Sequence, residues 1–570
     1  MKFLIKKFFI MLFLLSILQV EQKVFAKENY IKYEKENISN YFSGLVSINQ
    51  NFNKEAFEYL NKVRLKNKKH TKYNLEFVKT LVQLEKFDEA ITFSENAWTE
   101  DELIFEFDLL LGLKFFLEND YINAEKHFER LNIISRYNLF FSNFVGNILI
   151  AWSKAYQGKE KESFQFIEKI PDPYLQIKKT QNVLLKCYFD DSTTSNFFKE
   201  LIKDDKFSRY YFFYINYLLF NNQNKKANQA IKDGRKKYNS NLLLKQTENF
   251  ILNNKNTKIK NLFNCKNPKD SLAEFFYVIA NLYSSEENYK KSNFYIKISS
   301  FLNNKFLPNQ LLLAENYYFQ SKYKISKKTY KSLRSIGESY SWHAAKSIAT
   351  ILIDTKGKKY AVKSLQKEFN SITNPNFDHY YQLANFYKDN EYYEKSVEYY
   401  SLTLSKIKKD HFLVPKIFDR RGTSYERMGD WENAEKDLIK SLEILPDQAH
   451  VLNYLAYTWV DKGINLDKGL EMLITANEIK KNDGYIIDSL GWAYYAKENY
   501  AEAESFLQKA VELLPLDPII NDHYADTLWM LNKDIQARYF WNYVLKLDTT
   551  EKKLKDIINK KLIFGITKKL

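Results

Sequence analysis

The feature that most constrains this chain is a pattern of small residues that returns every 34 or 35 positions. Its clearest copy runs from Gly491 to Pro515 and reads GWAYYAKENYAEAESFLQKAVELLP. Gly491, Ala503 and Ala510 are small enough to let two antiparallel helices approach closely. Proline cannot continue a helix, so Pro515 ends the second one. The pattern therefore predicts a helix–turn–helix unit. The seam between its helices is filled by Leu490, Tyr494 and Leu507.

The same register recurs over most of the sequence. In the C-terminal half, eight units begin near residues 273, 307, 342, 377, 415, 449, 484 and 518. Near the N-terminus, the equivalent positions Gly44, Val78 and Gly112 step by 34 residues. Between residues 139 and 272 the register is irregular, and the stretch PDPYL from Pro171 interrupts it. A repeat of this regularity predicts an extended array in which each unit packs only against its neighbours.

The composition agrees with an array of helices joined by short loops. The chain has 42 Tyr and 44 Phe among its 570 residues, but only 14 Gly and 9 Pro. Few helix breakers and many large apolar side chains are typical of a mostly helical protein. The high aromatic content also argues against disorder.

The small, large and proline positions of the unit resemble those of the tetratricopeptide repeat, a helix–turn–helix unit of 34 residues. The resemblance implies an all-α fold, an α-α superhelical solenoid of tetratricopeptide repeats. We expect the following organisation: a signal peptide at 1–26, N-terminal repeat units at 27–138, irregular helical repeats at 139–272, a C-terminal repeat array at 273–550 and a basic capping helix at 551–570.

The C-terminal third is also similar to a group of exported bacterial cell-envelope proteins built from this repeat. The similarity is carried by LNYLAYTWVDKGINLDKGLEMLITA, followed by IIDSLGWAYYAKENYAEAE. Many members of that group are lipoproteins, whereas this chain has no Cys after its N-terminal apolar stretch. The resemblance implies a scaffold for protein–protein interaction in the envelope.

The first 26 residues have the three parts of a secretory signal peptide. Three lysines are followed by an apolar stretch from Phe8 to Val20 and by a small residue at Ala26. The apolar stretch is shorter than the roughly 20 residues that span a bilayer. We therefore expect cleavage between Ala26 and Lys27 and an exported, soluble, periplasmic protein. The alternative is an uncleaved N-terminus that anchors the chain in the inner membrane.

The formal net charge of +16 is unevenly distributed along the chain. Residues 1–410 carry about +19 and residues 411–550 about −8, so the C-terminal array is acidic. A basic surface is typical of proteins that bind nucleic acid or an anionic membrane. However, Lys far outnumbers Arg, the preferred residue for phosphate recognition. Together with the export signal, this argues against a nucleic-acid-binding solenoid, which we keep as a third hypothesis.

The first helices of successive repeats line a concave groove, which is the usual binding surface of the repeat family. Residues one position outside the packing set are expected to point into it. Polar side chains there satisfy an extended peptide backbone, and aromatic rings supply rigid apolar area. The acidic members favour a basic or donor-rich ligand, although solvent-facing polar positions without a binding role would give a similar pattern. The predicted groove residues are Asp419, Asn453, Tyr457, Asp488, Trp492, Tyr495, Asp522, Asp526 and Trp529.

The sequence contains no motif that carries catalysis. Its seven histidines form no pair at metal-ligand spacing, and it has no nucleophile elbow, phosphate loop or dinucleotide fingerprint. We expect no enzyme activity, no metal, no cofactor and no small-molecule substrate. The hypothesis is a non-enzymatic scaffold that binds a protein or peptide in the groove. The alternative is a membrane-attached subunit of an export or polysaccharide-secretion assembly.

Two further features concern the tail and the cysteines. Residues 551–570 place apolar residues at helical spacing between lysines, which favours a capping helix; the alternative is contact with an anionic membrane through the basic tail. Cys187 and Cys265 lie 78 positions apart. In a linear stack of helices spaced about 9 Å apart, that separation is too large for a disulfide. We therefore expect two free thiols.

Overall fold

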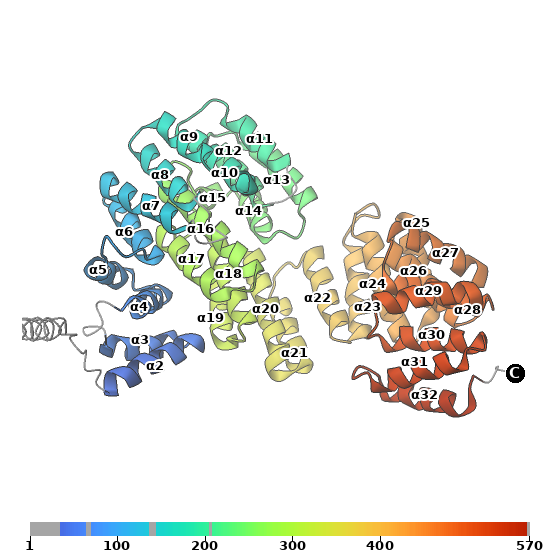
Figure 1. Ribbon diagram of the computed structural model, residues 1–570. Helices are drawn as coiled ribbons and strands as arrows, with labels where there is room; N and C mark the ends of the chain where they lie inside the picture. The colour runs from blue at the N-terminus through green and yellow to red at the C-terminus, as the bar shows by residue number, and fades with distance from the viewer. Residues whose placement is uncertain (1–34, 64–69, 136–143, 204–207, 567–570) are drawn as a thin grey trace, which may run out of the picture. The chain divides into compact units, whose positions relative to one another are not determined.

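The computed structural model describes residues 35–63, 70–135, 144–203 and 208–566. The expected signal peptide and its cleavage point between Ala26 and Lys27 lie outside these ranges. Within them the chain is built of helices and has no strand, which confirms the predicted all-α repeat fold. Its contacts divide it into two compact units, one up to Ala344 and the other from Ala345 (Figure 1).

The first unit contains the helices up to α20, which crosses the boundary between the units. In chain order they are α2 (Lys35–Asn49), α3 (Asn53–Val63), α4 (Thr71–Gln83), α5 (Phe87–Ala97), α6 (Phe105–Leu117), α7 (Tyr121–Ser135), α8 (Phe144–Tyr156), α9 (Glu160–Glu168), the 3-10 turn η1 (Asp172–Tyr174), α10 (Leu175–Tyr188), α11 (Thr194–Lys203), α12 (Arg209–Phe220), α13 (Asn224–Lys237), α14 (Leu242–Leu252), α15 (Asn256–Lys260), α16 (Pro268–Ser285), α17 (Tyr289–Leu302), α18 (Leu307–Phe319), α19 (Tyr323–Leu333) and α20 (Glu338–Lys356).

The second unit continues the repeat to the C-terminus as a series of antiparallel helix pairs. Its helices are α21 (Lys358–Asn370), α22 (Phe377–Asp389), α23 (Tyr393–Ser405), α24 (Val414–Arg427), α25 (Trp431–Ile444), α26 (Ala449–Asp461), α27 (Leu466–Ile479), α28 (Gly484–Ala496), α29 (Tyr500–Leu513), α30 (Pro518–Met530), α31 (Asp534–Lys546) and α32 (Lys552–Phe564).

The repeat pattern locates the first helix of each C-terminal pair closely. Helices α18, α22, α26, α28 and α30 begin at the residues from which the sequence repeat was counted. The seam inside the pairs also follows the pattern, because one glycine position packs against the residue sixteen positions later. A Cβ atom on Gly491 would lie 2.6 Å from Cγ of Leu507. The same contact is made by Gly44 with Leu60, Gly112 with Phe128 and Gly422 with Leu438.

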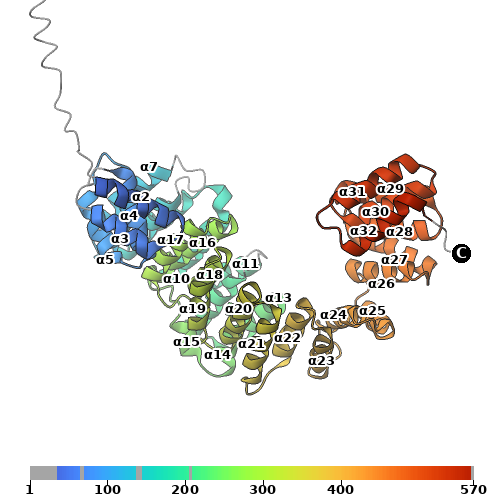
Figure 2. The ribbon, with the colours of Figure 1, turned by 90° about the horizontal axis from the view of Figure 1, so that it is seen from below.

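The first unit folds back on itself. Helix α16 lies against α8 and α10, and α17 lies against α4, so helices far apart in the sequence are neighbours (Figures 1 and 2). The rings of Phe87 and Phe301 stack with their centroids 4.2 Å apart. Lys297, which is almost fully buried, forms an ion pair with Glu85. These contacts hold the N-terminal repeats against α17.

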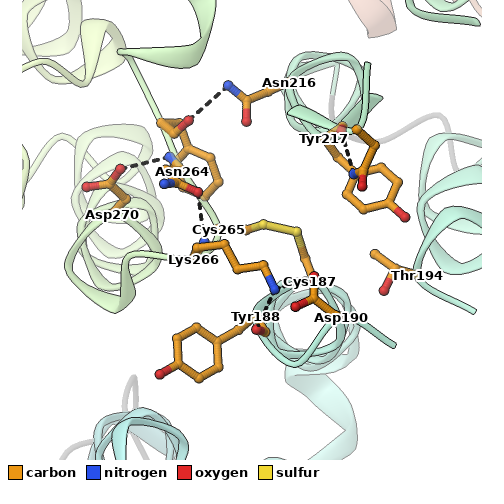
Figure 3. The surroundings of a disulfide bond; sticks show 12 residues. Cys187, Tyr188, Asp190, Thr194, Asn216, Tyr217, Asn264, Cys265, Lys266 and Asp270 are labelled. Carbon is orange, nitrogen blue, oxygen red and sulfur yellow. Dashed lines mark hydrogen bonds and ion pairs between the residues drawn. A yellow bond between two sulfur atoms is a disulfide. The ribbon is translucent and has the colours of Figure 1, made fainter. Parts of the chain in front are cut away.

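The fold-back corrects the prediction of two free thiols. Cys187 and Cys265 form a disulfide, with their Cα atoms 5.9 Å apart (Figure 3). The prediction assumed a linear stack of helices, but the chain folds back so that α16 packs against α10. Beside the disulfide, Lys266 donates a 2.9 Å hydrogen bond to the carbonyl of Tyr188 and pairs with Asp190. The covalent bond and these polar contacts therefore join the end of α10 to the loop before α16.

Candidate functional site: the groove of the second unit

The first helices of four successive pairs in the second unit form an open groove. Helices α22, α24 and α26, together with the start of α28, enclose about 600 Å³. Two of the predicted residues, Asp419 on α24 and Asn453 on α26, line it. A cavity of this size fits the range that holds small ligands or several residues of a peptide. The groove is lined by Lys388, Lys416, Asp419, Arg420, Thr423, His450, Asn453, Tyr454, Lys480, Asp483, Tyr485 and Ile486.

The acidic residues of this groove already have partners within the chain. Nε2 of His450 lies 3.1 Å from Asp419, and the ammonium of Lys480 lies 2.6 Å from Asp483. Asp483 is also the N-cap of α28, where it accepts hydrogen bonds from two backbone N–H groups. Asp419 therefore has a hydrogen-bond partner and Asp483 has an ion-pair partner, so neither carboxylate needs a cationic ligand to complete its contacts.

Three cations of the groove lack such partners. No carboxylate of the described chain lies within ion-pair distance of Lys388, Lys416 or Arg420. Arg420 instead donates a 2.8 Å hydrogen bond to Oδ1 of Asn385. Burial and repulsion from the nearby Arg420 lower the pKa of Lys388, although Asp389 and Asp419 oppose this effect. These three cations favour an anionic ligand in this part of the groove, rather than the basic ligand that the sequence led us to expect.

A second set of predicted residues surrounds His523 on α30. Its ring stacks on Trp492 with centroids 4.0 Å apart, and Trp492 stacks on Tyr495 at 4.5 Å. The Nδ1 atom lies 2.9 Å from Oδ1 of Asp488, and both side chains are buried. Tyr457 lies at the edge of the cluster, with its ring centroid 6.4 Å from that of His523. These four residues thus lie together, but they pack partly against one another.

The electrostatics of His523 follow from its neighbours. Burial disfavours the imidazolium, but Asp488, Asp522 and Asp526 outweigh it and raise the pKa of His523 above its ordinary value. A protonated His523 then neutralises the Asp488 carboxylate and presents an aromatic cation to the Trp492 ring. The cluster therefore combines stacked aromatic rings with a buried ion pair.

The remaining predicted residues are covered by the C-terminal helix. The ammonium of Lys561 on α32 lies 2.7 Å from both Asp522 and Asp526. Trp529 packs against Trp541 with ring centroids 5.4 Å apart, and Gly565 also lies close to the Trp529 ring. Helix α32 therefore covers the end of the array. Its Lys561 is a cationic donor from within the chain for Asp522 and Asp526.

The groove residues that sequence reasoning missed occupy neighbouring positions of the same repeat. Arg420, Tyr454 and His523 each stand one residue after a predicted groove residue. Lys416, His450 and Tyr485 each stand three residues before one. Positions three apart share a helix face, so the repeat itself carried this signal. Lys561 lies outside the repeat, and nothing in the register pointed to it.

Two features of the described chain concern other kinds of site. No described helix is long and apolar enough to cross a membrane. Within the same residues, no three or more His, Cys, Asp or Glu side chains are grouped so that they could hold a metal ion.

Comparison with known proteins agrees with the helix pairs described above. Residues 485–514, which form most of α28 and α29, match the family model of the tetratricopeptide repeat. A TPR repeat-containing protein of Pseudomonas aeruginosa is 33% identical over 90 residues, which is 16% of this chain and 15% of that relative. The chain is a tetratricopeptide-repeat protein. Repeats of this kind are in general scaffolds that bind other proteins.

Two solved structures are similar to parts of this chain at low identity. A tetratricopeptide repeat protein from Parabacteroides merdae is 18% identical with a TM-score of 0.33, over 39% of this chain and 85% of that one. MamA from Desulfovibrio magneticus is 16% identical with a TM-score of 0.28, over 32% of this chain and 99% of that one.

Proposed function

We propose that this protein is a non-enzymatic scaffold of the bacterial cell envelope that binds an acidic segment of a partner protein in the groove of its second unit. The observation that carries the proposal is the set of three cations, Lys388, Lys416 and Arg420, which line the groove without a carboxylate partner among the described residues. Arginine and lysine in a shared concave site form charge-assisted hydrogen bonds with carboxylates. An acidic segment would satisfy all three.

The amide of Asn453 supports an extended peptide as the ligand. Its Oδ1 atom is buried and has no hydrogen-bond partner among the described residues, although Asn453 lines the groove. A rotation of this amide toward the groove would break no bond at Oδ1 and would offer an acceptor to a backbone N–H. Tyr454 and Tyr485 add aromatic surface at the same place. The combination fits a peptide better than a small inorganic anion.

Two observations support an envelope location. The N-terminal pattern of lysines, an apolar stretch and Ala26 is typical of exported proteins. The disulfide between Cys187 and Cys265 is a bond that persists in oxidising compartments, such as the bacterial periplasm, and is rare in the cytosol. The proposal therefore includes cleavage between Ala26 and Lys27 and a periplasmic protein.

Binding of defined peptides tests the groove. A fluorescently labelled hexapeptide of alternating Asp and Glu should bind the full-length protein, as followed by anisotropy, and a Lys–Arg hexapeptide should not. The double variant Lys388→Gln/Arg420→Gln should weaken binding by about tenfold or more, because it removes two charge-assisted contacts. The matched control is Lys440→Gln on α25, whose lysine is exposed and outside the groove. Equal binding of the basic peptide, or an unaffected double variant, would refute the proposal.

The natural partner can then be located by site-specific crosslinking in the producing cell. A photoreactive residue at Thr423, inside the groove, should capture a partner that the same residue at Lys440 does not capture. The captured peptide should carry a run of Asp or Glu, and the Lys388→Gln/Arg420→Gln change should abolish its capture. A captured segment without acidic residues would contradict the assigned ligand chemistry.

The location has a separate test. Mass spectrometry of the protein from fractionated cells should find a chain that starts at Lys27 in the soluble envelope fraction. A chain that retains Met1 and stays with membranes would instead support an anchored protein.

A further inference from the structure

The first unit contains a second pocket that the groove of the second unit does not explain. It encloses about 490 Å³ between the N-terminal repeats and the helices that fold back on them. One wall comes from α2, α4 and α6, and the other from the end of α16 and the start of α17. This volume lies within the range of ligand-binding sites in proteins.

The pocket is formed by contacts between distant parts of the chain. The ammonium of Lys290 donates a 3.1 Å hydrogen bond to the carbonyl of Asn49, and Gln83 donates one of 3.2 Å to the carbonyl of Lys290. The stacked pair Phe87 and Phe301 also joins α5 to α17. The walls are therefore tied together by specific contacts, and the space between them is a preformed cavity.

The pocket contains more basic than acidic side chains. Four lysines and two glutamates line it. The ammonium of Lys79 lies 3.6 Å from a carboxylate oxygen of both Glu76 and Glu106, so it forms an ion pair with each glutamate. Burial raises the pKa of Glu106, although Lys79 opposes this effect, and the pocket loses part of its negative charge as a result.

The other three lysines are Lys290, Lys291 and Lys322, and no described carboxylate lies within ion-pair distance of them. The ammonium of Lys291 lies over the ring of Tyr283, 5.2 Å from its centroid. Burial and the neighbouring Lys290 lower the pKa of Lys322 to about 8. A cluster of like charges of this kind is relieved by an anion.

We propose that this pocket binds a small anionic ligand whose carboxylate or phosphate group is held by Lys290, Lys291 and Lys322. The amide side chains of Asn51, Asn53 and Asn293 line the same space and supply both donors and acceptors for the rest of the ligand. The ring of Tyr283 gives it an apolar face. The site lies wholly within the first unit and is independent of the groove in the second.

The experiment uses the full-length protein and two defined anions. Citrate and inorganic phosphate are titrated by calorimetry at constant ionic strength, with spermidine as a cation of comparable size. We expect at least one anion to bind with a Kd below about 1 mM and spermidine not to bind at this site. Binding of citrate alone identifies a carboxylate ligand, and binding of phosphate alone identifies a phosphate ligand.

Variants locate the binding. The double change Lys291→Gln/Lys322→Gln should weaken the anion by about tenfold, and Lys291→Arg/Lys322→Arg should retain it because the charges remain. The matched control Lys324→Gln/Lys328→Gln removes two exposed lysines of α19 that do not line the pocket. Lys388→Gln/Arg420→Gln checks that the second unit does not contribute. Circular dichroism confirms that each variant folds.

The inference would be overturned if neither anion binds at about 10 mM. An unchanged affinity in Lys291→Gln/Lys322→Gln, or equal binding of spermidine, would overturn it as well. None of them bears on the acidic peptide in the groove, because the two sites are tested by separate variants. Loss of anion binding in Lys388→Gln/Arg420→Gln alone would move the anion to the second unit and also refute the pocket.

Discussion

At the scale of single residues, His523 shows how one side chain changes the charge and the packing of the predicted groove residues around it. It stands between the acidic Asp488 and the ring of Trp492, and it is buried by both. The raised pKa of His523 means that its protonated form is stabilised by folding. The array therefore contains a buried ion pair that weakens as the pH rises and the imidazolium loses its proton.

We predict that His523→Gln destabilises the C-terminal repeats more at low pH than at high pH. At a pH of about 6 the free energy of unfolding should fall by about 2 kcal/mol, because Asp488 loses a charged hydrogen-bond partner. Since the pKa is raised in the folded state, the stabilisation is complete below the unfolded value of about 6.5 and is lost as pH rises through the folded value. The difference between wild type and variant should thus shrink as the pH rises and the folded protein loses the His523 proton.

Urea unfolding followed by hydrogen exchange in α28 and α30 measures this difference. The matched control is His450→Gln, whose imidazole is exposed beside Asp419 and should contribute little. A difference that stays constant or grows with pH would contradict the assigned pair.

Two glycines allow the packing of the repeat to be tested at one atom. A Cβ on Gly491 would lie 2.6 Å from Leu507 Cγ and 3.2 Å from the Leu507 backbone nitrogen. At Gly469 the nearest atom would be Val460 Cγ2 at 3.3 Å. In a helix interior, Ala is favoured over Gly by roughly 0.5–1 kcal/mol, whereas an overpacked seam costs about 1–3 kcal/mol. We predict that Gly491→Ala destabilises the protein and that Gly469→Ala leaves stability unchanged or raises it.

Thermal unfolding of the two variants beside wild type decides the sign of each effect. A Gly491→Ala protein as stable as wild type would show that the two helices can separate by a few tenths of an ångström at no cost.

The positions of the nine groove residues could be predicted because they depend only on the register. Asp419, Asn453 and Tyr457 lie on the first helices, as the repeat required, and two of them line the open groove. Their partners could not be predicted, because a pair such as Asp488 and His523 depends on the side chains of a neighbouring repeat. Which residues bind a partner remains a prediction.

At the scale of elements, α32 is the segment that decides which part of the groove is open. It buries Ile558 against Trp541 and Val544 and brings Lys561 to the two aspartates of α30. Burial and Asp522 raise the pKa of Asp526, although Lys561 opposes this effect. Without the ammonium, two carboxylates would be buried beside each other.

We predict that Lys561→Gln loosens α32 and the last helix pair. Removal of one partner of a buried ion pair costs about 3 kcal/mol, because the opposite charges remain buried. Hydrogen exchange should therefore rise in α30, α31 and α32 and stay unchanged in α22 and α24, since repeats are stabilised mainly by their neighbours. Lys560→Gln removes the exposed adjacent lysine and should change stability by no more than about 0.5 kcal/mol.

Adding Asp526→Asn to Lys561→Gln should recover part of the lost protection, because one buried charge is removed with its partner. Faster exchange throughout the second unit would instead indicate that the array unfolds as one cooperative block.

At the scale of the whole molecule, regular and irregular parts of the repeat behave differently. From α22 onward the first helix of each pair starts within one residue of the position that the repeat predicts, since each pair packs on the preceding one. The return of α16 to α8 and α10 could not be predicted, because the broken register between residues 139 and 272 fixes no direction for the chain. The disulfide and the anion pocket both result from that return.

The last prediction concerns the disulfide, whose loss should destabilise the first compact unit and leave the second unchanged. The bond between Cys187 and Cys265 closes a loop of 78 residues, for which chain entropy predicts a stabilisation of about 4 kcal/mol. A reductant should therefore lower the unfolding temperature of α10 to α16 and leave α24 to α31 unchanged, as followed by hydrogen exchange during heating. The Cys187→Ala/Cys265→Ala variant should resemble the reduced protein and be insensitive to reductant. Equal destabilisation of both units would show that they unfold together. No effect on either unit would show that the fold-back contacts hold the first unit together without the covalent bond.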